Sequence, residues 1–198
     1  MSDETTTGLN NRKILMWVFL GSDCMFFASL IGTYLIYKGM GAPHPGPADV
    51  FDIPTTSVST FVLLMSSMSM VFAYAYLVRS KIKAVRIWMI STIIMGATFL
   101  GFQVFEFSEF YFHDDLSPQT NLFGTTFYAL TGTHGIHVTV GVVWLGIIFY
   151  SSLFRNSVSS ETNLDLDLAA LYWHFVDIVW IVIFAVVYLF GTFKGFPS

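Results

Sequence analysis

The sequence has few charged residues for its length. Only 11% of its 198 residues are Asp, Glu, Lys or Arg, whereas 55% are hydrophobic and 21 are Phe. A soluble globular protein of this size needs far more charge to cover its surface. The composition therefore excludes an ordinary soluble domain and predicts a protein of the lipid bilayer.

Cysteine and blocks of basic residues are also scarce. Cys24 is the single cysteine and lies in an apolar run, so the sequence offers neither a disulfide framework nor a cysteine metal site. The nine Lys and Arg residues form no basic block, which argues against a nucleic-acid partner. The polar stretch 1–11 lacks the charged start, apolar core and cleavage site of a signal peptide, so we expect the first apolar segment to be retained.

Five apolar segments are each long enough to cross a hydrocarbon core of about 30 Å as a helix. A Pro-rich connector at 39–54 separates the first two segments, and Ser117-Pro118 resembles an N-cap followed by proline before the fourth. The sequence predicts an all-α, polytopic membrane bundle, with a polar tail at 1–11 and a membrane domain at 12–198. The expected transmembrane helices are 14–37, 55–78, 84–112, 122–154 and 168–193.

Lys and Arg are divided unequally between the two sides of the membrane that these spans define. The seven on the side of the N-terminus are Arg12, Lys13, Arg79, Lys81, Lys83, Arg86 and Arg155, and the two on the other side are Lys38 and Lys194. By the positive-inside rule we expect the N-terminus to be cytoplasmic and the C-terminus extracytoplasmic.

Ionisable side chains inside the spans are the candidate functional residues, because each is costly in hydrocarbon unless it has a partner. They are Asp23, Glu106, Glu109, His134, His137, His174 and Asp177. We expect Glu106 and Glu109 to be solvated at the extracytoplasmic interface. Asp23 lies near mid-span, so it needs a hydrogen bond or a water-filled cleft.

The intramembrane histidines leave three interpretations open. A single b-type haem could be held by His137 and His174, and a zinc ion by His134, His137, His174 and Asp177. The third interpretation, which we favour, is a polar network that packs helices, since the sequence offers no thiolates and no second cluster of ligands. In that network we expect helices 122–154 and 168–193 to pair, with His137 opposite His174 and His134 opposite Asp177.

Two of these helices carry signatures that resemble a known family. The run GTHGIHVT at 132–139 and the run LYWHFVDIVW at 171–180 resemble the two signature helices of subunit III of haem-copper terminal oxidases. The resemblance extends over nearly the whole chain and is to the short, five-helix form of the subunit.

Two further motifs of the same family match. Gln103 and Glu106-Phe107 fit the family pattern Q-x-x-E-[YF], and residues 20–27 fit its [FL]-x-x-S-E-x-x-F-F helix. Asp23 stands where many members have Glu. Because Asp is one methylene shorter, the contacts of the family Glu do not transfer directly to Asp23.

The resemblance implies an antiparallel bundle with a V-shaped cleft that holds phospholipid, packed directly on the catalytic subunit I and accompanied by subunit II. It implies that this chain carries no cofactor of its own and that haem and copper lie in the partner subunits. The implied role is accessory: stabilising subunit I and supporting proton uptake in a cytochrome c oxidase of the bacterial plasma membrane. Such a complex can belong to a larger respiratory supercomplex.

Three alternatives stay open at this point. The chain could be subunit III of a quinol oxidase, since members of that kind often carry Asp at the position of Asp23. It could be an accessory protein of a nitric oxide reductase, which shares the ancestry and motifs. A proton-coupled transporter would use Asp23 and the His/Asp residues, although we see neither the internal repeats nor the broken helices typical of that class.

Overall fold

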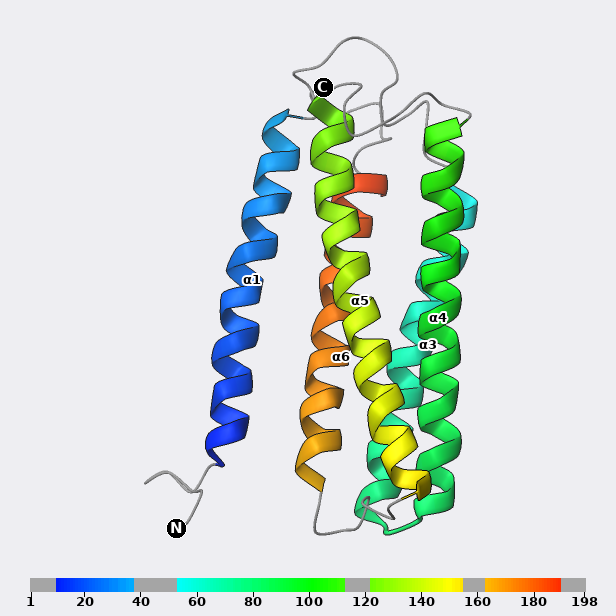
Figure 1. Ribbon diagram of the computed structural model, residues 1–198. Coiled ribbons are helices and arrows are strands. Elements are labelled where there is room, and N and C mark those ends of the chain that lie inside the picture. Colours follow the sequence, from blue (N-terminus) through cyan, green and yellow to red (C-terminus); the bar gives the residue numbers. More distant parts are fainter. Residues whose placement is uncertain (1–9, 38–52, 113–121, 155–162, 190–198) are drawn as a thin grey trace.

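The computed structural model describes residues 10–37, 53–112, 122–154 and 163–189 (Figure 1). The helices are α1 (Asn11–Tyr37), α3 (Ile53–Val78), α4 (Ile82–Phe112), α5 (Leu122–Phe154) and α6 (Asn163–Ile183), and α6 continues into a π-helical turn, η1 (Phe184–Leu189). All five are long and apolar enough to cross a membrane. The expectation of an all-α, polytopic membrane bundle is therefore confirmed.

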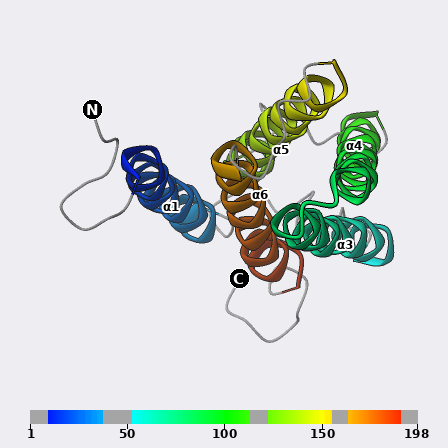
Figure 2. The same cartoon turned by 90° about the horizontal axis from the view of Figure 1, so that it is seen from below.

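Helices α3, α4, α5 and α6 surround a common core, and α1 lies outside them (Figure 2). In this arrangement α3 and α5 each contact both α4 and α6, whereas α1 contacts α5 and α6. In the most apolar stretch of α6, 56% of the residues are buried, against 17% in α1. Helix α6 is thus the most buried of the described helices, and α1 is a peripheral helix.

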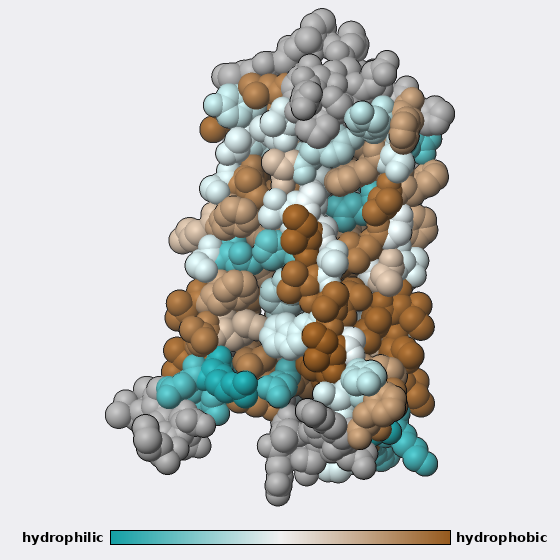
Figure 3. All heavy atoms as spheres, viewed as in Figure 1, coloured by the Kyte–Doolittle hydropathy of each residue, from teal (hydrophilic) through white to brown (hydrophobic). Residues whose placement is uncertain are grey.

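The outer surface is dominated by large apolar side chains, as Figure 3 shows for one face. Exposed positions include Leu15 and Met25 of α1, Val104 of α4 and Ile136 of α5. Such a surface would be unfavourable in water over this length, but it suits lipid acyl chains. The burial pattern therefore agrees with the membrane assignment made from composition.

A tight turn joins α3 to α4 and makes them an antiparallel pair. Ser80 adopts a left-handed backbone conformation with φ of 55°. Its N–H donates to the carbonyl of Leu77 at 2.9 Å, and the N–H of Lys81 donates to the carbonyl of Tyr76 at 3.0 Å. This is the Schellman arrangement, which satisfies carbonyls at a helix end and reverses the chain within a few residues.

Charged residues fix the lower end of α1, as seen in Figure 1, against the start of α6. Arg12 Nη1 lies 3.3 Å from Asp165 Oδ1, and Lys13 Nζ lies 2.7 Å from Asp167 Oδ2. We expected the last span to begin at 168, but α6 begins at Asn163. The acidic residues extend the helix because carboxylates are favourable near a helix N-terminus and here also meet cations.

The core is closed around Trp173 of α6. Its indole N–H donates to Ser66 Oγ of α3 at 3.0 Å. The ring reaches α4 and α5 where both have glycine: a Cβ atom added at Gly96 would lie 2.5 Å from Trp173 Cη2, and one added at Gly141 would lie 2.9 Å from the same ring. These two glycines therefore allow α4 and α5 to pack against a buried indole.

This packing predicts that Gly96→Leu lowers the free energy of unfolding by about 1–3 kcal/mol, the usual cost of overpacking a well-filled core. Gly101→Leu on the same helix is the matched control, because a Cβ at Gly101 meets no atom within 4 Å. Denaturant titration of the purified protein, followed by tryptophan fluorescence, measures both. Equal stability of the two variants would contradict the role assigned to Gly96.

Candidate functional site

The inner face of α1 brings a carboxylate to the bundle. Its buried residues are Met16, Leu20, Asp23, Phe27 and Tyr34. Their spacing of three, four and seven places them along one side of the helix. Asp23 is the ionisable residue of this stripe and is 9% exposed. The stripe packs against α5 and α6, so Asp23 points toward the other helices and away from lipid.

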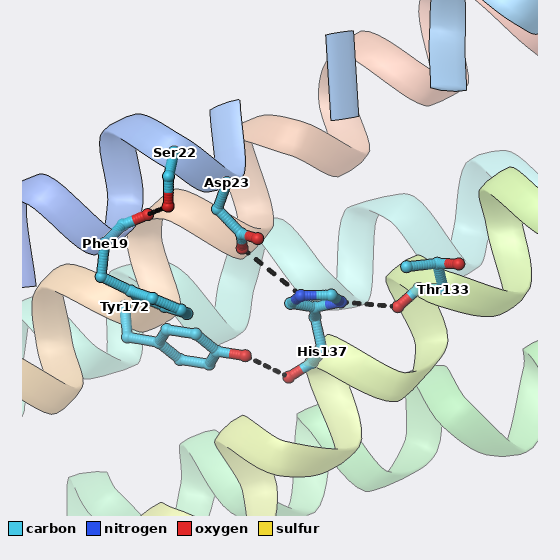
Figure 4. Close-up of polar contacts among 6 residues, drawn as sticks. All are labelled: Phe19, Ser22, Asp23, Thr133, His137 and Tyr172. Carbon is cyan, nitrogen blue, oxygen red and sulfur yellow. Dashed lines mark hydrogen bonds and ion pairs between the residues drawn. The ribbon is translucent and has the colours of Figure 1, made fainter. Parts of the chain in front are cut away.

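The partner of Asp23 is His137 of α5 (Figure 4). His137 Nε2 lies 3.3 Å from Asp23 Oδ2, and this oxygen has no other partner among the described residues. The other ring nitrogen, Nδ1, lies 2.7 Å from the carbonyl oxygen of Thr133, one turn earlier. A carbonyl can only accept a hydrogen bond, so Nδ1 must carry a proton.

Simple chemistry limits how this contact can become a hydrogen bond. With Nδ1 protonated, Nε2 of a neutral His137 is an acceptor, so a hydrogen bond between Nε2 and Asp23 requires a proton on the carboxyl group or on Nε2. Both of those forms have zero net charge, which hydrocarbon tolerates better than a lone carboxylate. The contact therefore joins α1 to α5 through one polar pair inside the membrane span.

Tyr172 of α6 and Phe27 of α1 hold His137 in place. The Tyr172 hydroxyl donates to the backbone carbonyl of His137 at 3.0 Å. The Phe27 ring meets the imidazole edge-to-face, with centroids 5.0 Å apart. The pair thus lies at the junction of α1, α5 and α6.

An apolar groove adjoins this pair between α1 and α5, with α6 behind it. It has a volume of about 380 Å³ and is lined by Met16, Phe19, Ile136, His137, Val140, Trp144 and Tyr172. Figures 1 and 2 show that α1 and α5 are closest in their upper parts and diverge toward their lower ends. We call this space the α1–α5 groove.

His134 lies one turn from His137 but in a different environment. It is fully buried and stacks on Trp180, with ring centroids 4.9 Å apart. Phe99 and Phe27 meet it edge-to-face at 6.0 and 6.4 Å. Neither ring nitrogen has a hydrogen-bond partner in the described part of the chain. The structure therefore makes His134 part of the aromatic core of the bundle.

Gln103 and Glu106 connect α4 to its neighbours. Gln103 Nε2 donates to the carbonyl of Thr131 on α5 at 2.8 Å. Glu106 accepts hydrogen bonds from Thr56 Oγ1 of α3 at 2.6 Å and from the Tyr188 hydroxyl at 3.2 Å. The π-helical turn η1 carries Tyr188, so this turn directs a hydroxyl toward the carboxylate.

The expectation of simple interfacial solvation therefore fails for Glu106, because two other helical segments supply hydroxyl partners to it. Glu109, three residues further along α4, is exposed and lines a surface hollow with Phe105, Ser108 and Phe112. The two carboxylates differ because residues three apart on a helix point about 60° away from each other. Only the Glu106 side faces α3.

The expected pairing of His174 with His137, and of Asp177 with His134, is wrong. His174 Nδ1 lies 3.0 Å from Ser67 Oγ of α3, and the Asp177 carboxyl approaches the same hydroxyl. Helices α5 and α6 do pack together, but through Tyr172 with the His137 backbone and Trp180 with His134. The sequence argument assumed that consecutive helices join their polar faces, whereas this face of α6 turns to α3.

The haem and zinc interpretations need side chains that the fold keeps apart. His137 faces α1, and His174 faces α3. Both nitrogens of His137 already have polar neighbours, which leaves neither free for iron. Across the described ranges, no three His, Cys, Asp or Glu side chains lie close enough to share a metal ion. The zinc set His134, His137, His174 and Asp177 is therefore not assembled.

Sequence reasoning missed the hydroxyl side of α3. Besides Ser67 and Ser66, Thr60 Oγ1 accepts the indole N–H of Trp180 at 3.0 Å. A signal for this face was present in the sequence, because six hydroxyl residues fall within one apolar span. They are Thr56, Ser59, Thr60, Ser66, Ser67 and Ser69, and the structure buries all of them. Most of them recur at helical spacing, as expected of hydroxyl residues that bond across membrane helices.

The Asp23–His137 contact can be tested by a double-mutant cycle with Asp23→Leu, His137→Leu and the combined variant. We expect a coupling energy of about 0.6 kcal/mol, the average for polar contacts between membrane helices. Asp23→Asn should keep most of the stability, because its amide can donate to Nε2. The measurement is the free energy of unfolding in mixed detergent.

Cys24→Leu is the control for this cycle, because Cys24 is the next residue on α1 but is exposed. It should leave stability unchanged. A coupling energy of zero, or an Asp23→Asn variant as unstable as Asp23→Leu, would contradict the assigned contact.

Comparisons with known proteins identify the family of this chain. Residues 3–192 match the family model described as cytochrome c oxidase subunit III. The chain is 36% identical over 181 residues to cytochrome c oxidase subunit 3 of Bacillus sp. (strain PS3), which covers 91% of this chain and 86% of that protein. It is 37% identical over 176 residues to quinol oxidase subunit 3 of Bacillus subtilis (strain 168), with 88% and 85% covered.

A third relative extends the same pattern. The chain is 36% identical over 176 residues to cytochrome bo(3) ubiquinol oxidase subunit 3 of Pseudomonas putida, covering 89% of this chain and 84% of that protein. These three relatives thus include subunits of both cytochrome c and quinol oxidases, and each of the three is a third subunit. The chain belongs to the cytochrome c oxidase subunit III family and is a membrane subunit of a haem-copper terminal oxidase.

Proposed function

We propose that this chain is the accessory subunit III of an aerobic cytochrome c oxidase in the bacterial plasma membrane. It packs on subunit I, beside subunit II, and it stabilises subunit I during turnover. Haem and copper are held by those partners. Membership of the subunit III family argues against the transporter hypothesis, and the relatives named above are oxidase subunits, which favours an oxidase over a nitric oxide reductase.

The observation that carries the accessory role is the way the intramembrane polar residues are used. Asp23 meets His137, Gln103 meets Thr131, Glu106 meets Thr56 and Tyr188, and His174 meets Ser67. Each contact joins two helical segments of this same chain. Such a set supports a rigid scaffold, because buried polar groups in hydrocarbon are most stable when the protein itself supplies their partners.

Two features support the further parts of the role. The Asp23–His137 pair places a carboxyl group and an imidazole 3.3 Å apart inside the span, which suits a subunit that helps proton uptake by its neighbour. The α1–α5 groove is apolar and opens where the two helices diverge, which suits a V-shaped cleft that holds phospholipid. Neither feature requires a cofactor in this chain.

Cytochrome c is the proposed electron donor because the most similar relatives include cytochrome c oxidases of Bacillus sp. (strain PS3) and Bacillus subtilis (strain 168). Quinol is the second candidate. It is favoured by Asp23, which stands where many cytochrome c oxidases have Glu, and by the relatives named as quinol oxidase subunits. The donor binds to other subunits, so this choice concerns the complex and not the residues of this chain.

The proposed orientation can be tested with single cysteines in a Cys24→Ser background. Ser80→Cys, in the exposed α3–α4 turn, should be on the cytoplasmic side, and Phe112→Cys, at the far end of α4, should be outside. A membrane-impermeant maleimide added to intact cells should label the second variant and miss the first. Labelling of Ser80→Cys from outside would contradict the proposed orientation and place the α3–α4 turn on the outer side of the membrane.

The accessory role predicts that the oxidase complex purified without this subunit keeps its haem content but loses activity faster during turnover. Haem is measured by its absorbance, and activity by oxygen consumption with reduced cytochrome c or with a quinol as the donor. Loss of one haem per missing subunit would contradict the accessory role. If the complex consumes oxygen with quinol but not with reduced cytochrome c, then quinol is the electron donor and the complex is a quinol oxidase.

A further inference from the structure

One side of α6 is not covered by the other described helices. In Figure 2, α1 and α3 lie on opposite sides of α6, and α5 lies on a third side. Ile178 and Ile181 of α6 are 59% and 43% exposed, although α6 is the most buried of the described helices. These two side chains therefore mark the fourth, uncovered side.

His174 belongs to this uncovered side. It is half-buried and lies four residues before Ile178 and seven before Ile181. Because each residue turns an α-helix by about 100°, these three side chains lie within about 60° of one another around α6. With Leu171, the spacing is three, four and three residues, which is the spacing along a seam between packed helices. We call Leu171, His174, Ile178 and Ile181 the α6 stripe.

The α6 stripe holds a polar atom in the middle of the span. His174 lies eleven residues after Asn163 and fifteen before Leu189, which is about 16 and 22 Å along the helix. Its Nδ1 lies 3.0 Å from Ser67 Oγ, but Nε2 has no hydrogen-bond partner in the described part of the chain. Unlike the nitrogens of His134, Nε2 is not sealed inside the bundle.

Hydrocarbon cannot hydrogen-bond to Nε2, so a neighbouring protein helix is a more stable environment for it than lipid. The single proton of the Ser67 hydroxyl can go to His174 Nδ1 or to the Asp177 carboxyl, which approaches the same hydroxyl. In a neutral imidazole, Nε2 is then a donor in the first case and an acceptor in the second. A hydroxyl group both donates and accepts, so it satisfies Nε2 in either tautomer.

Helix α3 provides a wall beside the α6 stripe. Leu64 and Val71, three residues before and four after Ser67, are 36% and 52% exposed, and both turn from Ser67 in the same direction around the helix. Leu63 and Met70 turn the other way and are buried. Ser67 thus lies at the edge between the core and the outer surface of α3. A helix lying on the α6 stripe would contact Leu64 and Val71 as well.

We propose that a transmembrane helix of another oxidase subunit packs on the α6 stripe, and that a hydroxyl side chain of that helix hydrogen-bonds to His174 Nε2. The proposal rests on the proposed function and deepens it, because it names the face of this chain that meets a partner subunit. Membership of the subunit III family supports this choice of occupant, since a subunit of an oxidase has other subunits as its neighbours.

The first test places a photo-crosslinking benzoylphenylalanine at Ile178 in the whole oxidase complex. The matched control places it at Ile94 of α4, which is also 59% exposed and lies on a helix across the bundle from the α6 stripe (Figure 2). After irradiation of native membranes, mass spectrometry identifies the products. We expect position 178, and not position 94, to cross-link to another oxidase subunit. Products with lipid alone or with a second copy of this chain, or equal yields at the two positions, would overturn the proposal.

The hydrogen bond is tested by comparing His174→Leu with Ser67→Ala in the complex. Both variants lose the contact between α6 and α3, but only His174→Leu also loses Nε2. We expect His174→Leu to weaken retention of this chain by the haem subunits in detergent by about threefold relative to Ser67→Ala, the effect of one average interhelical hydrogen bond. Equal retention would overturn the assigned bond.

The same samples test the proposed function separately. If the parent chain does not purify with the haem subunits, the proposed function fails. If it does, but positions 178 and 94 behave alike, only the interface on α6 fails.

Discussion

The rest of the structure depends on one constraint: hydrocarbon offers no hydrogen bonds, so a polar side chain within a span is most stable when the protein supplies its partner. For three of these side chains the partner comes from another helix. Asp23 joins α1 to α5, Gln103 joins α4 to α5, and His174 joins α6 to α3. These polar residues, which are unfavourable in hydrocarbon without a partner, therefore connect specific pairs of helices. Apolar side chains fill the space between the helices.

The sequence predicted what can be derived from local patterns. Apolar length alone indicated five spans, and the depth of Asp23 showed that it required a partner. The identity of that partner could not be derived, because residues 23 and 137 are brought together only by the packing of α1 on α5. Glu106 was misjudged for the same reason: its distance from the end of the span was correct, but the hydroxyls of Thr56 and Tyr188 lie on other segments.

The error over His174 and Asp177 has a different cause. Consecutive helices are adjacent more often than not, and α5 and α6 are indeed adjacent. A central helix, however, has several neighbours, and its polar residues can turn to any of them. The run of hydroxyl residues in α3, with Ser66 and Ser67, would have identified the right one, but our prediction did not use it.

The peripheral position of α1 has a consequence for the order in which the protein is built. Helix α1 is synthesised before α3 and α4, yet its main neighbours α5 and α6 follow them. Until residue 137 has entered the membrane, Asp23 has no partner from its own chain. Helix α1 must therefore wait in the bilayer with an unpaired Asp23, until α5 brings the imidazole and α6 brings the carboxylates that complete its attachment.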